Sequence, residues 1–444
     1  MIKLILYCII LLIKYIRSTE DACPKHSSSH GKITKLTPSN IPFTLVSITL
    51  ADVAEENTTV EMKSDAYQFP NSYIERYIKY RYYVASIEGE EKSFVFGGID
   101  FTNMETFFDG IIYVNSKLHF VEQIQEWQSF NATVDFAGKS ALPDKWGMRR
   151  WVEERKYLYY TEDDIEPLSH INDSIEVPIA DGKQSLFKQL RQMMDIPAEI
   201  ATIKKVCSVN VLLDSYFMEN VVNYNIKQAI HEVIILYGSL DFLYRMLDFA
   251  DAGKPNHFGF QIAKITVIMR SNNHVTQSKF PLAGKYMNLI SSISLGDDRC
   301  LGVSFTYQYL EGVAGRAFQG SASSGIFIDR KDVGPITANR NIAYVNYMLP
   351  STNQIMVRGS ILNTLAHEVG HTFGAIHEEN TRCTKSKGSL MATHLEKVEG
   401  YYFKISPCNV NLMKHHITAR IDKFLKCPHK MNVYDNLVYQ EYKG

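Results

Sequence analysis

The sequence predicts an α/β (α+β) domain with a mixed sheet and long helices, preceded by a mainly-β domain. Short alternating segments separated by turn residues recur from about residue 40 to 165, which is typical of a β sandwich or barrel. After about residue 205, strand-like and helix-like segments follow one another, as they do in α/β and α+β folds. The cysteines also distinguish the two regions, since five of the seven lie after residue 200.

Three segments carry the alternating pattern of the first region, namely residues 43–48, 80–86 and 110–115. From residue 165 to 205 the chain becomes polar and irregular, which indicates a linker. We therefore expect a β-rich domain at residues 20–165 and a linker at residues 166–202.

The second region opens with a strand-like segment at residues 207–213, followed by a helical stretch at 217–249 that forms one helix or two. Ser360 is expected to cap a further helix that runs to about Phe373. Between these helices lie three more strand-like segments, at residues 261–269, 301–307 and 342–347. We expect this domain to span residues 203–427, with a C-terminal tail at 428–444.

Composition excludes several classes of protein. The formal net charge is −1 over 444 residues, so the chain has no overall basic field for binding nucleic acid. Hydrophobic residues make up 45% of the chain, which excludes wholesale disorder. A mean hydropathy of −0.16 excludes a polytopic membrane protein. We expect a globular chain of two or three domains.

Residues 1–19 have the pattern of a secretory signal peptide, a short positive segment followed by an apolar run at residues 4–13. That run is shorter than the roughly 20 residues that cross a bilayer, and an uncleaved anchor is the alternative. Six cysteines beyond the leader and three glycosylation sequons, starting at Asn57, Asn131 and Asn172, agree with export. We therefore expect a secreted, extracellular protein without a stable membrane anchor.

Residues 367–377 carry the strongest chemical pattern of the sequence, His-Glu-Val-Gly-His-Thr-Phe-Gly-Ala-Ile-His. On a helix, His367 and His371 are one turn apart and project from the same face, where they can share a metal ion. Gly374 allows the helix to end, so that the turn after it brings in His377 as a third nitrogen ligand. Three imidazoles leave one coordination position open, which is the arrangement of a catalytic zinc ion.

The position of Glu368 beside the first of these histidines predicts the reaction. Its carboxylate can reach a water on the metal and remove a proton from it. We therefore predict one catalytic Zn²⁺ and hydrolysis of peptide bonds by attack of a zinc-bound water, with Glu368 as general base. Proteins or peptides are the expected substrates.

The motif with its third histidine resembles the signature of the metzincin zinc proteases. Met391, within Gly-Ser-Leu-Met-Ala, stands where these enzymes have a methionine-containing turn beneath the metal. Over about residues 80–427 the chain is most similar to the ADAM (adamalysin, or reprolysin) family, in its Kuzbanian-like branch. The further similarity lies in residues 89–94, 160–165, 300–301 and 312–318.

This resemblance implies a metzincin-type protease domain whose β-rich N-terminal region is a propeptide domain and an intramolecular inhibitor. It implies that substrate adds as an extended strand beside a cleft strand formed by Val313, Ala314, Gly315, Arg316 and Ala317. It also implies two disulfides, Cys207 with Cys300 and Cys383 with Cys408.

Several positions depart from the family pattern. Glu378 follows the third histidine, where the family usually has Asp. Astacins have Glu there, but their metal-site tyrosine has no match after Met391. Phe327 stands where the Kuzbanian-like pattern has a cysteine, so Cys427 loses its expected partner. Cys427 and Cys23 can bridge each other, pair between chains or stay free, and the sequence leaves these alternatives open.

Latency also has more than one interpretation. Residues 165–206 contain no cysteine to occupy the zinc, which leaves Cys23 as the only propeptide candidate for a cysteine switch. No Arg-x-x-Arg processing site precedes Cys207. Arg316 is interpreted either as a cation at the cleft rim that favours acidic substrates or as a solvated edge-strand charge.

The chain continues for only 17 residues after Cys427, without a cysteine-dense disintegrin module or an anchor, so we expect a secreted enzyme with a single protease domain. The alternative is a proteolytically weak or latent zinc-bearing binding or decoy protein that keeps its prodomain. The intact Glu368 favours the enzyme, whereas the missing processing site and Glu378 favour the alternative.

Overall fold

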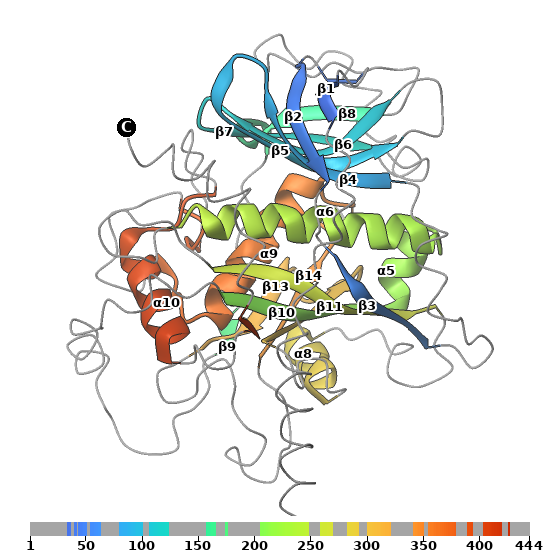
Figure 1. The fold of residues 1–444 in the computed structure, drawn as a ribbon. Coiled ribbons are helices and arrows are strands. Elements are labelled where there is room, and N and C mark those ends of the chain that lie inside the picture. The colour runs from blue at the N-terminus through green and yellow to red at the C-terminus, as the bar shows by residue number, and fades with distance from the viewer. Residues whose placement is uncertain are drawn as a thin grey trace, which may run out of the picture.

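The described part of the molecule consists of two β-sheets and the helices packed against them. The computed structural model describes residues 33–36, 40–41, 43–50, 54–63, 80–100, 106–123, 157–165, 174–175, 205–247, 258–269, 282–292, 300–320, 341–349, 354–378, 389–393, 403–419 and 425–426. Figure 1 shows a seven-stranded sheet, then helices, then an eight-stranded sheet, with α8 (Ala283–Ser292) beyond it. This arrangement confirms the predicted α+β fold class with a mainly-β N-terminal layer.

The seven-stranded sheet, called the N-terminal sheet below, is an antiparallel meander. Positive φ angles at Asn115 (53°) and Ser116 (62°) form the two-residue turn between its fifth and sixth strands. The short helix η2 (Glu162–Asp164) follows its last strand. In order, the strands are β1 (Ile33–Leu36), β2 (Leu45–Leu50), β4 (Tyr80–Ile87), β5 (Glu90–Asp100), β6 (Phe107–Val114), β7 (Lys117–Gln123) and β8 (Tyr157–Thr161).

The eight-stranded sheet is mixed. Five strands run parallel in the order β3 (Ala54–Lys63), β11 (Phe258–Ile268), β10 (Lys205–Leu213), β12 (Leu301–Thr306) and β14 (Ile342–Asn346). Next to them lie β13 (Gly315–Phe318), antiparallel to β14, and β9 (Ser174–Ile175), while β15 (Leu425–Lys426) pairs with the start of β10. Strands β3 and β9, which the sequence did not predict in this sheet, therefore cover its two edges.

The helical stretch predicted at residues 217–249 forms two helices, α5 (Ser215–Asn220) and α6 (Ile226–Arg245). Each has a side-chain cap, because Asp214 accepts from the backbone N–H of Phe217 and Asn225 accepts from that of Gln228. Two further helices, α8 and α10 (Pro407–Ala419), were not predicted. The buried apolar residues of α8, namely Ala283, Tyr286, Met287 and Ile290, do have helical spacing, so this helix was a missed signal in the sequence.

The helix that carries the histidine motif is α9 (Arg358–Thr372), and the prediction that Ser360 caps it is wrong. Its N-cap is Val357, whose side chain makes no cap hydrogen bond. Ser360 instead lies in the first turn, with its N–H donating to the Val357 carbonyl at 3.0 Å. The helix begins earlier because side chains of the N-terminal sheet accept the N–H groups of Arg358 and Gly359.

One hydrophobic core runs from the N-terminal sheet through α6 and α9 into the eight-stranded sheet. Phe94 on β5 stacks on Phe242 of α6, with ring centroids 4.0 Å apart. Among the described residues, no helix combines the length and apolar character needed to cross a bilayer. The core thus joins segments that lie more than 100 positions apart in the sequence.

Candidate metal centre

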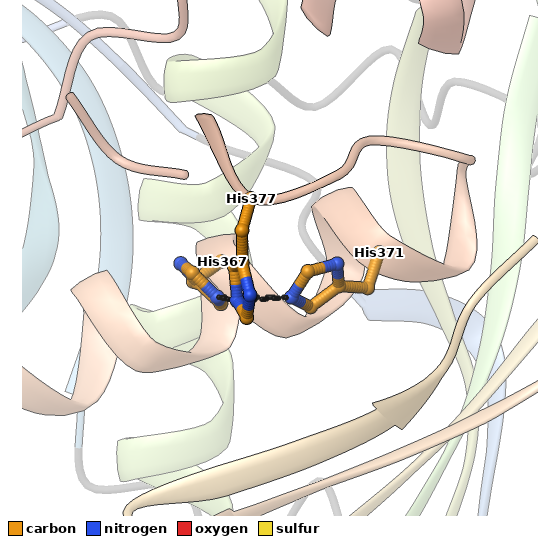
Figure 2. A group of neighbouring side chains, drawn as sticks. All are labelled: His367, His371 and His377. Atoms are coloured by element: carbon orange, nitrogen blue, oxygen red, sulfur yellow. Dashed lines mark hydrogen bonds between the residues drawn. The ribbon is translucent and has the colours of Figure 1, made fainter. Parts of the chain in front are cut away.

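Helix α9 and the turn after it bring three imidazole rings together. The Nε2 atoms of His367 and His371 lie 3.0 Å apart, and the Nε2 atom of His377 lies 3.3 Å and 3.1 Å from them (Figure 2). All three side chains are buried, with His367 and His371 at 0% exposure. Three nitrogen donors therefore face one point inside the protein.

The other nitrogens of two of these rings determine the protonation of the cluster. His367 Nδ1 lies 2.5 Å from the Leu390 carbonyl oxygen, and His371 Nδ1 lies 3.0 Å from that of Ala375. Because a carbonyl only accepts, each Nδ1 carries the proton, and a neutral ring then presents a bare lone pair at Nε2. Two lone pairs at this separation repel unless an electron-pair acceptor lies between them. The donor set thus fits a divalent cation that prefers nitrogen ligands.

The end of α9 turns sharply to place His377. Gly374 has φ +94°, and its N–H donates to the His371 carbonyl, while the N–H of Ala375 donates to the Gly370 carbonyl. This pair of bonds is a Schellman motif, which ends a helix with a left-handed residue. A side chain at position 374 would be strained, so glycine allows the turn that returns His377 to the other two rings.

Asn409 on α10 binds the backbone of the same turn. Its side-chain Oδ1 accepts from the Ile376 N–H at 3.0 Å, and its Nδ2 donates to the Ile376 carbonyl at 2.9 Å. Asn409 is fully buried, and its Nδ2 also lies 3.4 Å from Glu378 Oε1. One amide side chain thus fixes the backbone next to His377.

The turn that contains Met391 lies beneath α9. A Cβ placed at Gly370 would lie only 2.7 Å from the Met391 sulfur, so the glycine allows the methionine to pack against the helix. The Met391 carbonyl accepts the Glu378 N–H at 3.1 Å. Because Leu390 in this turn also accepts from His367, the turn contacts both arms of the cluster.

Glu368 lies between the histidine cluster and strand β13. Its side chain is fully buried, and a Cβ placed at Gly315 would lie 2.8 Å from its Oε1 atom. The glycine therefore leaves the space that the carboxylate occupies beside β13. An acid in this position can exchange a proton with a group held between the cluster and the strand.

The comparisons with known proteins agree with this geometry. A family model described as Metallo-peptidase family M12 matches residues 204–409, which include the whole cluster. Disintegrin and metalloproteinase domain-containing protein 10 of Homo sapiens is 24% identical over 349 residues, and that of Bos taurus is 24% identical over 351. The Xenopus laevis protein is 29% identical over 164 residues.

This chain contains an ADAM-like metzincin domain. The human and bovine alignments each cover 72% of this chain and 42% of the relative, so the chain spans less than half the length of those relatives. The Xenopus laevis alignment covers 33% of this chain and 20% of the relative. M12 peptidases are zinc-dependent, in agreement with the nitrogen donor set of the cluster.

In the metzincin domain, strand β13 is shorter than the predicted cleft strand. It includes Gly315, Arg316 and Ala317, whereas Val313 and Ala314 precede it in the turn. Gly315 and Ala317 belong to the face of the strand near α9, since alternate residues of a strand share a face. Arg316 pairs in register with Tyr344 and faces α8, so its half-buried side chain lies on the other side of the sheet.

The cysteines of the metzincin domain are partly described. Cys207 and Cys300 form a disulfide that joins β10 to the start of β12. Cys408 is disulfide-bonded, while Cys383, its expected partner, lies outside the described residues together with Cys23 and Cys427. The Cys207–Cys300 bond closes a long stretch of chain between two neighbouring parallel strands.

Sequence reasoning missed Asn409 and the clearance that Gly315 gives to Glu368. Asn409 lies 32 positions after His377, and its type does not distinguish it from a surface asparagine. The role of Gly315 depends on the packing of β13 against α9, which a local pattern does not specify.

Proposed function

We propose that this chain is a zinc-dependent endopeptidase that hydrolyses peptide bonds in proteins. The observation that carries the proposal is the convergence of three buried Nε2 atoms beside the buried carboxylate of Glu368. His367, His371 and His377 would hold one catalytic Zn²⁺. When bound, zinc lowers the pKa of water and polarises the scissile carbonyl.

Residues of the chain supply proton transfer, substrate binding and positioning of the metal ligands. Glu368 takes the proton of the attacking water and delivers it to the leaving amine nitrogen. The backbone of β13 receives the substrate as an added strand, so that its scissile bond lies next to Glu368. Met391 and Asn409 keep the imidazoles in place from below and from the side.

We also propose that the N-terminal region is an intramolecular inhibitor. Strand β9 pairs with β13 through Ala317↔Ser174 and Phe318↔Ile175, on the edge of β13 that β14 leaves open. A substrate strand needs the same backbone groups, so it competes with β9. This occupied edge also supports the second candidate function, a latent zinc-bearing binding or decoy protein.

Secretion belongs to the same proposal. The leader pattern at residues 1–19 and the three sequons support an extracellular, glycosylated zymogen with a signal peptide. The Cys207–Cys300 disulfide agrees with an oxidising compartment.

Replacing Glu368 with Ala tests the proposed reaction. We expect Glu368→Ala to retain zinc but to lower the rate of cleavage of a quenched fluorescent peptide library by about 10²–10⁴-fold, because the proton acceptor is lost. Glu219→Ala, an exposed acid on α5, is the matched control and should cleave at the wild-type rate. Full activity of Glu368→Ala would contradict the assignment.

The same assay separates the two candidate functions. Ile175→Pro removes a backbone donor from β9 and should raise the rate of the intact chain, because the β13 edge becomes available. A zinc-loaded protein that stays inactive with this substitution and after cleavage of the linker would be a binding or decoy protein.

A further inference from the structure

The N-terminal sheet contacts the metzincin domain at the start of α9, far from the metal cluster. Arg358 opens the helix and His367 lies nine residues later, which is roughly 13 Å along the axis of a helix. Figure 1 shows the sheet on the side of α6 that faces away from the eight-stranded sheet. Occupation of the β13 edge therefore belongs to β9, and the sheet itself docks elsewhere.

The first turn of α9 takes its cap from this sheet. The backbone N–H of Arg358 donates to the Glu122 carboxylate of β7, at 3.2 Å to Oε2, and the N–H of Gly359 donates to the Tyr160 hydroxyl of β8 at 2.8 Å. The N-cap residue of the helix, Val357, has no side chain able to do this. Two free N–H groups of the histidine helix are thus satisfied from the N-terminal sheet.

The Arg358 side chain is held between the two parts of the protein. Its guanidinium donates to Asp109 of β6 and to the Val121 carbonyl of β7, and on the other side to Glu232 of α6 at 2.8 Å. The side chain of Arg358 is 3% exposed, so water does not replace these partners in the docked state. Departure of the sheet would remove two of the three groups that the cation binds.

A second polar contact lies next to this one. His231 of α6 lies 2.9 Å from the Tyr82 hydroxyl through Nδ1, and 3.2 Å from Asp109 through Nε2. Tyr82 and Asp109 both belong to the N-terminal sheet, and all three side chains are buried. A buried polar network with partners on both sides favours one docking geometry.

Two glycines give the apolar part of the interface its shape. A Cβ at Gly238 of α6 would lie 2.1 Å from the Phe96 ring of β5, and one at Gly359 would lie 2.4 Å from Ile165. Glycine is unfavourable inside a helix, so its presence at position 238 indicates that Phe96 needs the space. The surface of α6 is therefore shaped to receive the sheet.

We propose that the N-terminal sheet stays bound in the active enzyme after the linker is cut, with Glu122 and Tyr160 as the N-cap of helix α9. The sheet is then a permanent positioning subunit, and activation requires only that β9 leaves β13. The inference rests on the proposed protease function for its activity readout, but its binding readout is independent of activity.

The test uses the full chain with Cys23→Ser, so that no disulfide from the N-terminal region can join the pieces, and a specific cleavage site inserted between residues 176 and 204. After the cut, we expect both pieces to elute together in size-exclusion chromatography, with one zinc ion per complex. Gly238→Ala should raise the dissociation constant of the pieces roughly 10- to 100-fold, because its methyl group overlaps Phe96. Gly284→Ala, in α8 with no contact closer than 3.8 Å, is the matched control and should leave the complex intact.

The positioning role has its own readout. Within the cut complex, Glu122→Ala should lower kcat for a fluorescent peptide without raising KM, and Glu122→Gln, which keeps an acceptor, should restore kcat. Separation of the cut wild-type pieces as readily as those of Gly238→Ala would overturn the inference, as would an isolated C-terminal piece with the kcat and zinc affinity of the complex. Intact complexes that bind zinc but cleave no peptide would contradict the proposed function and leave retention of the sheet standing.

Discussion

A few side chains determine where the three imidazoles point. Two backbone carbonyls fix the proton positions of His367 and His371, and Asn409 fixes the backbone beside His377. Each of these contacts orients a nitrogen lone pair toward the same point without touching it. Groups of this kind usually affect metal affinity by about 10- to 100-fold when they are removed.

Asn409→Asp should therefore weaken zinc binding. A carboxylate can accept from the Ile376 N–H but cannot donate to its carbonyl, and it would add a negative charge near Glu378. We expect zinc affinity, measured by competition with a chromogenic chelator, to fall by about 10-fold or more. Asn411→Asp, an exposed position on the same helix, should bind zinc as the wild type does. Equal affinities for the two variants would contradict a positioning role for Asn409.

Two metal ligands and the general base could be predicted from the sequence, because helical spacing alone places His367, Glu368 and His371 together. The third ligand followed from Gly374, whose conformation makes the turn possible. Asn409 and Gly315 were not accessible, because they act through contacts between elements that are distant in the chain.

Among the secondary-structure elements, the N-terminus of α9 is one of the places where the N-terminal sheet contacts the metzincin domain. Burial, opposed in part by Arg358, raises the pKa of Glu122 to about 7, and burial together with Asp163 raises the pKa of Glu162 to about 7. Burial also acts on Asp109, but the charges of Arg358 and His231 outweigh it and hold the pKa of that carboxyl well below its usual range. The interface therefore binds protons near neutral pH through glutamates.

The pH dependence of unfolding should reveal the raised pKa of Glu122. The pKa of Glu122 is higher in the folded state than its ordinary 4.5, so the folded protein binds more protons between about pH 4.5 and 7. Its contribution to stability is greatest below that range and declines as the pH rises through it. Glu122→Gln should reduce the pH dependence of the free energy of unfolding, measured by urea titration between pH 5 and 8. The slope should fall by the equivalent of up to about one bound proton.

Arg358, Glu232 and Tyr160 act on Glu122, and Asp109 and His231 belong to the same network through Arg358. All five groups are the same in both proteins. The difference between the two profiles therefore isolates Glu122. Glu88→Gln, at an exposed ion pair with Lys35, is the control and should follow the wild-type profile. Parallel profiles for Glu122→Gln and wild type would contradict the shifted pKa.

Most long elements were predictable because their apolar periodicity is local. Strands β4, β10, β12 and β14 and the helix pair α5 and α6 lie where the pattern placed them. The start of α9 was not predictable, since its cap comes from Glu122, 236 positions away in the sequence. Strand β9 has only two residues and forms because β13 offers an open edge.

At the scale of the whole molecule, the fold class and the M12 domain followed from the sequence, whereas the placement of the N-terminal sheet did not. That placement depends on Phe94 and Phe96 against α6 and on a buried cation shared by both parts. The periodic pattern of a sequence segment does not predict contacts between residues so far apart in the chain. The result is a single core in which the N-terminal layer supports the helix that carries the histidines.

The proposed function requires that one zinc ion in the histidine cluster makes this chain a protease. The most direct measurement is a zinc titration of the metal-free, linker-cut protein, with bound zinc and the rate of peptide cleavage determined on the same samples. We expect cleavage to rise in proportion to bound zinc and to saturate at about one ion per chain. Cleavage by the metal-free protein, or a protein that binds one zinc ion without cleaving any peptide, would contradict the proposed function.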